Sequence, residues 1–236
     1  MALLEVACFD PKHAILAFEA GADRIELCEN REAGGTTPPL VWLTSIKSRI
    51  TVPILVMIRP RGGDFDYSDA EYEQMKTAIE VFKPFADGYV FGILDQDRKV
   101  HVAKNVELVR LAHPLPCTFH RAFDETPDPF EAFEDVSSAG FRAILSSGCA
   151  ATASAGNQIL AQLVEMSNGT RERITVMPGG GVRSKNIAAM KAYTRATIFH
   201  SAGILEGMAS PSADEIRGMK HLLRTPITSL PPPMSC

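Results

Sequence analysis

The regular alternation of short apolar runs with longer amphipathic stretches is the feature of this sequence that most limits its fold. Eight runs are rich in Val, Ile, Leu and Phe and have the length of buried parallel strands. They cover residues 3–8, 24–28, 54–58, 88–94, 117–120, 143–146, 174–177 and 197–200. Eight strands that alternate with helices in a chain of 236 residues predict a single-domain α/β fold, the (β/α)8 TIM barrel, which typically takes about 250 residues.

Helix boundaries between these runs support the alternation. Asp10 is a suitable N-cap, and Pro11 suits the first position of a helix over residues 11–20. Further helices are expected over residues 69–83, 128–139, 184–192 and 214–223. A doubly wound open sheet is the alternative, but it normally places a GxGxxG loop after its first strand, and the sequence has none there. The barrel is expected to span residues 1–224, followed by a Pro-rich tail over residues 225–236.

Composition restricts the class of protein and its compartment. The net charge of −4 argues against a nucleic-acid-binding domain, which usually carries a basic face. The sequence contains no apolar run of about 18 residues, so no membrane span is expected. Five cysteines, spread widely in a chain without an export signal at its start, indicate free thiols and a cytoplasmic protein.

The carboxyl ends of the predicted strands carry many polar residues, and these ends form the active site of a TIM barrel. The stretch after the third strand, with Arg59, Arg61 and Asp64 around two glycines, is typical of an anion-binding loop. Guanidinium groups provide the forked donors that bind carboxylate or phosphate. As an alternative, Arg59 forms a buried structural ion pair with Glu5 or Glu26, which lie on the first two strands.

A candidate acid–base group follows the fifth strand. His120 belongs to the residue type that most often transfers protons, and Glu26 or Asp124 would orient its ring. These three residues are therefore the candidate catalytic groups. The alternatives are that His120 is a hydrogen-bonded core histidine and that Asp124 only begins the next turn.

The sequence VMPGGGVRSKN is a second candidate anion site. A strand ends there, Gly179, Gly180 and Gly181 follow, and Ser184 begins the next helix. Backbone N–H groups of a glycine turn and of a helix N-terminus bind phosphate or carboxylate, and the loops after strands 7 and 8 usually hold phosphate in this fold. Ser201, at the last strand, adds a hydroxyl group. The alternative is that the glycines serve only a sharp turn.

Two cysteines are candidate metal ligands. Cys8 and Cys28 end neighbouring strands, whose backbones lie about 4.8 Å apart in a sheet. Two close thiolates bind a soft ion such as Cu(I). Side-chain alternation, however, places Cys8 on the face opposite to Glu5 and Cys28 on the same face as Glu26. The alternative is therefore that both cysteines are buried small hydrophobic residues.

Several motifs together resemble the CutC copper homeostasis family. They are GADRIELC, EAGGTTP, VMIRPRGGDFDYSD, TFHRAFD, ILSSGC, VMPGGGV and FHSAG. The resemblance implies a TIM barrel, a cytosolic role in copper handling, Cu(I) bound by cysteines, and assembly into homo-oligomers, dimers or tetramers. It carries over most directly to the polar residues of intact motifs, which are Arg59, Arg61, Asp64, His120, Arg121 and Asp124. The segment between Gly203 and Asp214 is short compared with that of the family, which would alter one side of the mouth.

Two hypotheses for the function follow. In the first, which the resemblance favours, the chain is a copper homeostasis protein that binds Cu(I) through cysteine thiolates. In the second, it is an enzyme that acts on a small anionic or phosphorylated metabolite. The mouth is rich in Arg, Asp, Glu and His and poor in thiols, which suits the second hypothesis, but the sequence assigns no reaction. A non-catalytic scaffold is the third alternative.

Overall fold

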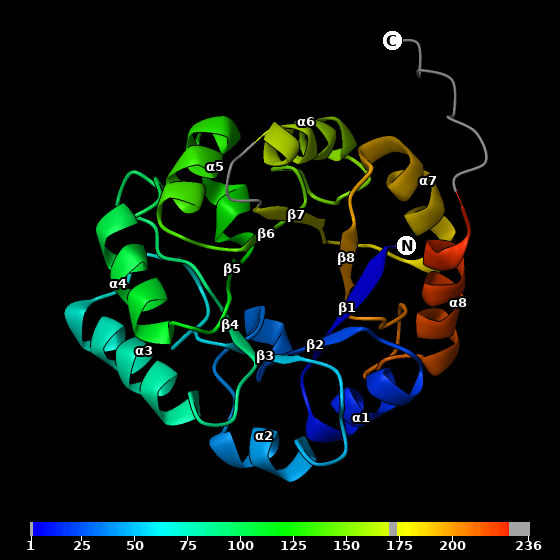
Figure 1. The fold of residues 1–236 in the computed structure, drawn as a ribbon, viewed down its shortest axis with the longest axis horizontal. Helices are drawn as coiled ribbons and strands as arrows, with labels where there is room; N and C mark the ends of the chain where they lie inside the picture. The colour runs from blue at the N-terminus through cyan, green and yellow to red at the C-terminus, as the bar shows by residue number, and fades with distance from the viewer. Residues whose placement is uncertain (1, 170–173, 227–236) are drawn as a thin grey trace.

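The predicted barrel is confirmed. The computed structural model describes residues 2–169 and 174–226 and contains eight parallel strands that alternate with helices (Figure 1). The strands are β1 (Leu3–Cys8), β2 (Arg24–Leu27), β3 (Ile54–Met57), β4 (Gly88–Phe91), β5 (Cys117–Phe119), β6 (Ala143–Ser146), β7 (Thr175–Pro178) and β8 (Ile198–Ser201). Hydrogen bonds join them in the order β7-β6-β5-β4-β3-β2-β1-β8. The sheet curls so that β7 and β8 face each other in Figure 1.

The helices form a ring outside the sheet (Figure 1). They are α1 (Pro11–Glu19), α2 (Leu40–Ile46), α3 (Asp69–Phe82), α4 (Val102–Ala112), α5 (Pro129–Ser138), α6 (Asn157–Gly169), α7 (Ser184–Thr194) and α8 (Ala213–Arg224). Short 3-10 helices follow β2 and β5, at Arg31–Ala33 and Arg121–Glu125. The helices predicted from the sequence match α1, α3, α5, α7 and α8 within two residues at each end.

Helices α2, α4 and α6 lie outside the ranges predicted from the sequence. Helix α2 begins after Pro39, which provides no side-chain cap, and α4 is capped by a ring nitrogen of His101, an uncommon N-cap. Caps such as Ser68, at the start of α3, are the ones that a sequence reveals. Helices without such caps are stabilised mainly by packing an apolar face on the sheet.

Successive side chains of each strand alternate between the helix layer and the barrel interior. In β1, Leu4 and Cys8 face the helices and belong to the main hydrophobic core, whereas Glu5 faces the interior. The interior holds a smaller apolar cluster, formed by Cys28, Leu55, Met57 and Val90. Polar side chains occupy further interior positions, among them Glu5, Glu26 and His200, and they form the site described below.

A fully buried carboxylate lies in this interior. Glu5 pairs with Arg24 of β2 and with His200 of β8, whose Nδ1 is 2.8 Å from Glu5 Oε1. The strand register explains both contacts, because Glu5 lies opposite Arg24 on one side and opposite His200 on the other. Each carboxylate oxygen therefore has a partner, and the two partners offset the cost of burying the charge.

The far end of the chain is described only in part. Helix α8 ends at Arg224, where the barrel domain is expected to end. Residues 227–236, most of the predicted tail, lie outside the described residues, so this boundary stays a prediction. No helix in the described ranges combines the length and apolar character that a membrane span needs.

Removal of Arg24 tests the buried network. In Arg24→Ala, Glu5 keeps only His200 as a partner while it stays buried, so the free energy of unfolding is expected to fall by about 3 kcal/mol. Urea unfolding followed by circular dichroism measures the change. The control is Lys47→Ala, which breaks a more exposed pair with Asp87 and is expected to cost less than about 1 kcal/mol. Equal losses in the two variants would contradict the role given to the buried pair.

Candidate functional site

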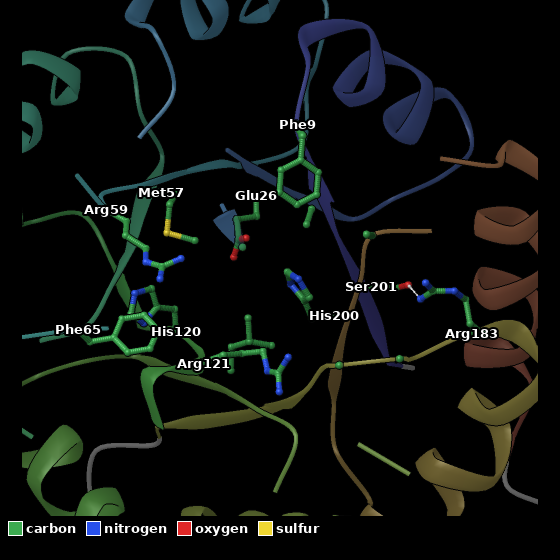
Figure 2. A pocket seen from close by; sticks show the side chains of 16 residues that line it. Phe9, Glu26, Met57, Arg59, Phe65, His120, Arg121, Arg183, His200 and Ser201 are labelled. Atoms are coloured by element: carbon green, nitrogen blue, oxygen red, sulfur yellow. Dashed lines mark hydrogen bonds between the residues drawn. The ribbon is translucent and has the colours of Figure 1, made fainter. Parts of the chain in front are cut away.

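A cavity of about 220 Å³ opens at the carboxyl ends of the strands. Its polar side chains come from β2, β8 and the segments after β3, β5 and β7 (Figure 2). They are Glu26, Arg59, His120, Arg121, Arg183, His200 and Ser201. The cavity thus combines three guanidinium groups with one carboxyl group, and this positive character suits an anionic ligand.

Arg59 extends from the end of β3 into the mouth and is 5% exposed. Its Nη1 donates to the carbonyl oxygens of Ala33 and Gly35 at 2.8 and 3.3 Å, and its Nη2 donates to Gly63 O at 2.7 Å. The guanidinium carbon also lies 4.6 Å from the ring centroid of Phe65. Arg59 therefore ties the loops after β2 and β3 together while one edge of its guanidinium group remains at the cavity.

His120 is buried beside Arg59. Its Nδ1 accepts a hydrogen bond from Ala122 N at 3.3 Å, and its ring packs edge-on against Phe65 with 4.8 Å between centroids. Burial, and then the charge of Arg59, lower the pKa of His120 to about 3. The imidazole is therefore neutral at physiological pH. Because Nδ1 is the acceptor, the proton is assigned to Nε2.

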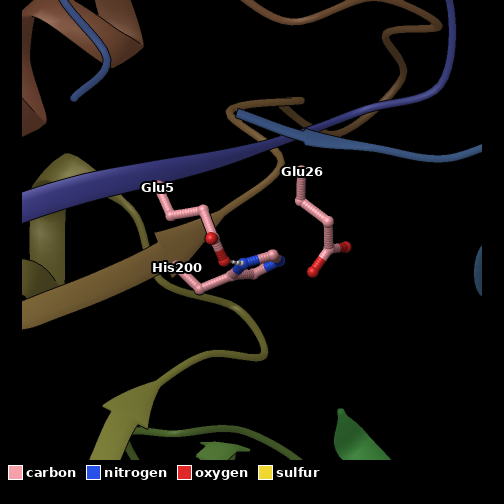
Figure 3. A group of neighbouring side chains, drawn as sticks. All are labelled: Glu5, Glu26 and His200. Carbon is pink, nitrogen blue, oxygen red and sulfur yellow. Dashed lines mark hydrogen bonds and ion pairs between the residues drawn. The ribbon is translucent and has the colours of Figure 1, made fainter. Parts of the chain in front are cut away.

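Glu26 and His200 meet at the same cavity. Glu5, Glu26 and His200 each bring one N or O atom to within 4.8 Å of the others, and the imidazole of His200 lies between the two carboxyl groups (Figure 3). Burial lowers the pKa of His200, but the Glu26 and Glu5 carboxylates outweigh this effect and raise it. Burial raises the pKa of Glu26, which brings this carboxyl group closer to the range needed for acid–base work.

The same three residues have the spacing of a metal site, but Glu5 is already engaged by two partners. Both oxygens of Glu5 are already bonded, one to Arg24 and one to His200. A cation here would have to displace Arg24 and leave its charge unpaired. We therefore interpret Glu5 as the residue that orients the His200 ring toward Glu26.

Three buried polar atoms at this cavity have no hydrogen-bond partner. They are Glu26 Oε2, Arg59 Nε and His120 Nε2. Six such atoms occur in the described part of the chain, so half of them gather at one site. An unpaired buried polar atom costs about 1–3 kcal/mol, and folded proteins leave few of them. This concentration indicates a site whose bonds are completed by a ligand.

The contacts of Glu26 also settle an alternative drawn from the sequence. Glu26 Oε1 accepts from the thiol of Cys28 at 3.2 Å, and Glu5 pairs with Arg24 and His200. Within the described ranges Arg59 forms no ion pair with either carboxylate. The alternative of a structural pair between Arg59 and these residues is therefore wrong, because backbone carbonyls satisfy the guanidinium instead.

The turn after β7 contributes backbone donors. Gly180 and Gly181 have φ angles of 95° and 77°, which favour glycine. Neither N–H group has an acceptor among the described residues, as an anion-binding turn requires. Ser201 Oγ donates to Val182 O at 2.7 Å and accepts from Arg183 Nη1 at 3.2 Å. The hydroxyl of Ser201 therefore positions Arg183 at the cavity.

Gly179 differs from its two neighbours. Its N–H donates to Ser146 O at 2.9 Å, so its role as a direct ligand of an anion stays a prediction that this bond does not favour. A Cβ at this position would lie 3.2 Å from His200 Cβ and 2.4 Å from Leu145 Cδ1. Glycine is needed here because it leaves room for the His200 ring.

Arg61 and Asp64, the predicted anion clamp, bond to each other and to their own loop. Arg61 Nη2 pairs with Asp64 Oδ1 at 2.9 Å, and Nε pairs with Glu71 Oε1 at 2.6 Å. Its other N–H groups donate to the carbonyl oxygens of Gly62, Asp64 and Asp66. All five N–H donors of this guanidinium are therefore occupied. Glu71, in the first turn of α3, folds back against the loop. The anion clamp therefore stays a prediction, and the bonds of Arg61 do not favour it.

Asp124, a predicted catalytic group, is engaged in structural bonds, and its catalytic role stays a prediction. Its carboxylate accepts bonds from Ser147 N and Oγ at 2.9 Å, Ser146 Oγ at 2.6 Å, Cys149 N at 3.2 Å and Arg121 Nε at 2.8 Å. These bonds join the loops after β5 and β6 and saturate the carboxylate. Within the described chain neither Asp124 nor Glu26 contacts the His120 ring, so the expected orientation of His120 by a carboxylate is wrong.

The two candidate copper ligands face opposite sides of the sheet. Cys8 belongs to the core under the helices, and Cys28 belongs to the interior cluster. Burial, and then the Glu26 carboxylate, raise the pKa of both thiols well above the ordinary value. Cu(I) prefers thiolates, whereas these groups hold their protons. Cu(I) binding by this pair stays a prediction, and the arrangement of the two thiols does not favour it.

Two residues that line the cavity, Arg183 and His200, were not among the site residues predicted from the sequence, although both lie in motifs noted there. Arg183 follows the glycine turn, and His200 is the second residue of FHSAG. Their types and positions could have identified them, because charged residues next to strand ends of a barrel are candidates for the site. What the sequence does not show is which side chains turn into the cavity.

The fold and the cavity define a (β/α)8-barrel protein with a positively charged pocket at the end of the barrel where such proteins carry their active sites. The chain belongs to the CutC family, whose model matches residues 2–205. It is 44% identical over 199 residues to the human copper homeostasis protein cutC homolog, with 84% of this chain and 72% of the human protein covered. A CutC family protein of Chromobacterium violaceum is 44% identical over 201 residues, or 85% and 80% of the two chains.

Solved structures agree with this assignment. A Streptococcus agalactiae protein described as CutC superposes with a TM-score of 0.80 at 30% identity, covering 86% of this chain and 99% of that one. Phosphoribosylanthranilate isomerase from Pyrococcus furiosus superposes with a TM-score of 0.63 at 10% identity, covering 94% and 98%. The second similarity shows the fold alone. The resemblance seen in the sequence motifs is thus confirmed.

The pKa values of the two cavity histidines are expected to be shifted in opposite directions. His120 should stay neutral until its pKa of about 3, whereas His200 should stay protonated above the ordinary value of 6.5. Two-dimensional NMR of the ring nitrogens measures both values, and the variants His120→Gln and His200→Gln assign the resonances.

The shifted pKa values of His120 and His200 make the free energy of unfolding depend on pH. The stabilisation due to neutral His120 is lost as the pH falls from 6.5 toward 3, because the unfolded chain takes up the proton first. The stabilisation due to His200 is lost as the pH rises through its raised pKa. Ordinary titration of His120 near pH 6.5 would contradict the burial and charge effects described above.

Proposed function

We propose that the chain takes part in copper homeostasis, the role for which its relatives are named, and that its own molecular activity is to bind a small anionic molecule at the barrel mouth. The observation that carries the second part is the gathering of three unpaired buried polar atoms at one positively charged cavity. A ligand with both donor and acceptor atoms would satisfy Glu26, Arg59 and His120 together, and each completed bond would offset about 1–3 kcal/mol of desolvation.

The cavity has two sides with different chemistry. On one side, Arg121 lies beside the glycine turn, since a Cβ on Gly180 would be 3.4 Å from Arg121 Cζ. Together with the N–H groups of Gly180 and Gly181 and with Arg183, it suits a phosphate or carboxylate. The other side holds the unpaired atoms. A volume of about 220 Å³ equals about seven water molecules at about 30 Å³ each, so the ligand is a small metabolite.

The free cysteines bear on the compartment in which the protein works. We place the protein in the cytoplasm because Cys8, Cys28, Cys117 and Cys149 are free thiols, which persist in a reducing compartment. Assembly into a homodimer or homotetramer stays a prediction.

Inorganic phosphate tests the anion site. Isothermal titration is expected to show one phosphate per chain, with affinity reduced about tenfold or more in Arg121→Gln and in Arg183→Gln, because each loses a charge-assisted hydrogen bond worth about 1.5–3 kcal/mol. The control Arg217→Gln removes an exposed arginine of α8 and is expected to keep the affinity. Arg61→Gln should keep it as well, because its donors are occupied within its own loop. Equal affinity in all four variants would place phosphate elsewhere.

Direct Cu(I) binding is the second candidate, and the names of the relatives favour it. Anaerobic titration against a competing Cu(I) chelator tests it in the wild type, in the double variant Cys8→Ser/Cys28→Ser and in the control Cys149→Ser, which removes an exposed thiol. We expect the double variant to retain the wild-type affinity, because its two sulfurs lie on opposite faces of the sheet. Tight one-to-one binding that only the double variant loses would instead establish a thiolate copper site.

A further inference from the structure

The cavity contains more acid–base machinery than the binding of an anion requires. We propose that it catalyses proton transfer at a carbon atom next to a carbonyl group in a small phosphorylated or carboxylated substrate, with Glu26 as the base and with His120 and Arg59 as donors to the carbonyl oxygen. This inference rests on the proposed anion site, which would hold the charged end of the substrate. It adds a reaction class and a substrate class to that site.

The donors to the carbonyl oxygen are held in place before any ligand arrives. Phe65 contacts both groups, with its ring centroid 4.8 Å from that of His120 and 4.6 Å from the guanidinium carbon of Arg59. The other polar atoms of the two side chains bond to backbone, which leaves His120 Nε2 and Arg59 Nε as the free donors. Fixed donors aimed at a developing negative charge stabilise it without reorganisation.

The neutral state of His120 suits this role. A neutral imidazole donates a hydrogen bond through Nε2–H to a carbonyl oxygen, and it then stabilises the enolate oxygen without having to give up a charge of its own. Pairs of groups whose environments move their pKa values apart are typical of acid–base sites. Here burial and Arg59 lower the pKa of His120, and burial raises that of Glu26.

The base is positioned by its neighbours. Glu26 Oε1 is held by the Cys28 thiol, while Oε2 has no partner and belongs to a cavity-lining residue. The His200 ring lies between Glu26 and Glu5 (Figure 3), and its Nδ1 is fixed by Glu5 at 2.8 Å. His200 is therefore a positioning residue that keeps a donor beside the Glu26 carboxylate.

The proposed step balances without any co-reactant. The Glu26 carboxylate takes the proton from the carbon, and the electron pair of the broken C–H bond forms the C=C bond of an enolate. The carbonyl oxygen receives the negative charge and is held by the N–H groups of His120 and Arg59. Protonated Glu26, after exchanging its proton with solvent, then returns a proton to the same carbon and restores the carbonyl group, and nothing is oxidised or reduced.

Nucleophilic catalysis fits the cavity less well. The thiol of Cys28 donates to Glu26 and has a raised pKa, and the hydroxyl of Ser201 donates to Val182 O. A carbonyl oxygen such as Val182 O does not remove the Ser201 proton, and Cys28 is not among the residues that line the cavity. Proton transfer uses the groups that are unpaired, whereas acyl transfer would need groups that are already occupied.

Exchange of hydrogen for deuterium tests the proposal directly. Proton NMR in D₂O follows the C–H groups next to the carbonyl of dihydroxyacetone phosphate, of hydroxypyruvate and of uncharged dihydroxyacetone. We expect the full chain to accelerate exchange of at least one anionic probe and not of dihydroxyacetone. Glu26→Gln should lose at least about 100-fold in rate, and His120→Gln about 100-fold. The exposed-residue controls Glu165→Gln and His221→Gln should keep the wild-type rate.

The variant His200→Gln tests whether His200 acts on the Glu26 carboxylate or only stabilises the fold. Glu26 faces His200 of β8, Glu5 of β1, Arg24 of its own strand and Cys28 directly after that strand. Loss of the positive His200 should raise the pKa of Glu26, so the acid limb of the pH–rate profile should move to higher pH. A lower rate with an unmoved profile would overturn the positioning role.

The outcomes distinguish this inference from the anion site beneath it. Exchange that depends on Glu26 supports both. Saturation-transfer NMR that shows a probe bound in an Arg121-dependent way, with equal exchange in the wild type and Glu26→Gln, overturns proton transfer and leaves the anion site standing. If neither anionic probe binds or exchanges, both proposals are overturned. Circular dichroism spectra that match the wild type ensure that each variant is folded.

Discussion

The buried carboxylate of Glu5 is the interaction on which the polar interior of this barrel depends. A charge without any exposure is tolerated only with partners, and the strand register brings Arg24 and His200 to its two sides. The same contact that offsets the burial of Glu5 fixes the His200 ring next to Glu26. Stability and site geometry are therefore linked through one side chain.

The mouth of the barrel contains two kinds of polar side chain. In some, every polar atom has a hydrogen-bond partner within the chain, and in others one buried atom has none. Arg61 and Asp124 have their bonding capacity filled by their own loops, and they fasten those loops to α3 and to β6. Glu26, Arg59 and His120 each keep one buried atom without a partner. This distinction, rather than residue type, indicates which side chains are available to a ligand.

Membership of the CutC family and the chemistry of the cavity point in different directions. The named relatives are associated with copper, and Cu(I) prefers soft sulfur ligands. The polar side chains of the cavity are mainly guanidinium and imidazole groups with one carboxyl group, and Met57 is its single sulfur-containing lining residue. A part in copper homeostasis is compatible with both observations if the protein acts on a small molecule and does not itself carry the metal.

Local patterns in the sequence were sufficient to predict the barrel, the strands and the helices with strong caps, because side-chain alternation and capping act over a few residues. They also placed Cys8 and Glu5 on opposite faces. The function of each polar residue was decided only by the tertiary structure. Glu5 and His200 are 195 residues apart, and hydrogen bonds between such distant groups determine which donors are occupied. The sequence by itself thus determined the fold and the end of the barrel where the site lies. Only folding decided which side chains there remain free to bind, since that depends on contacts between strands.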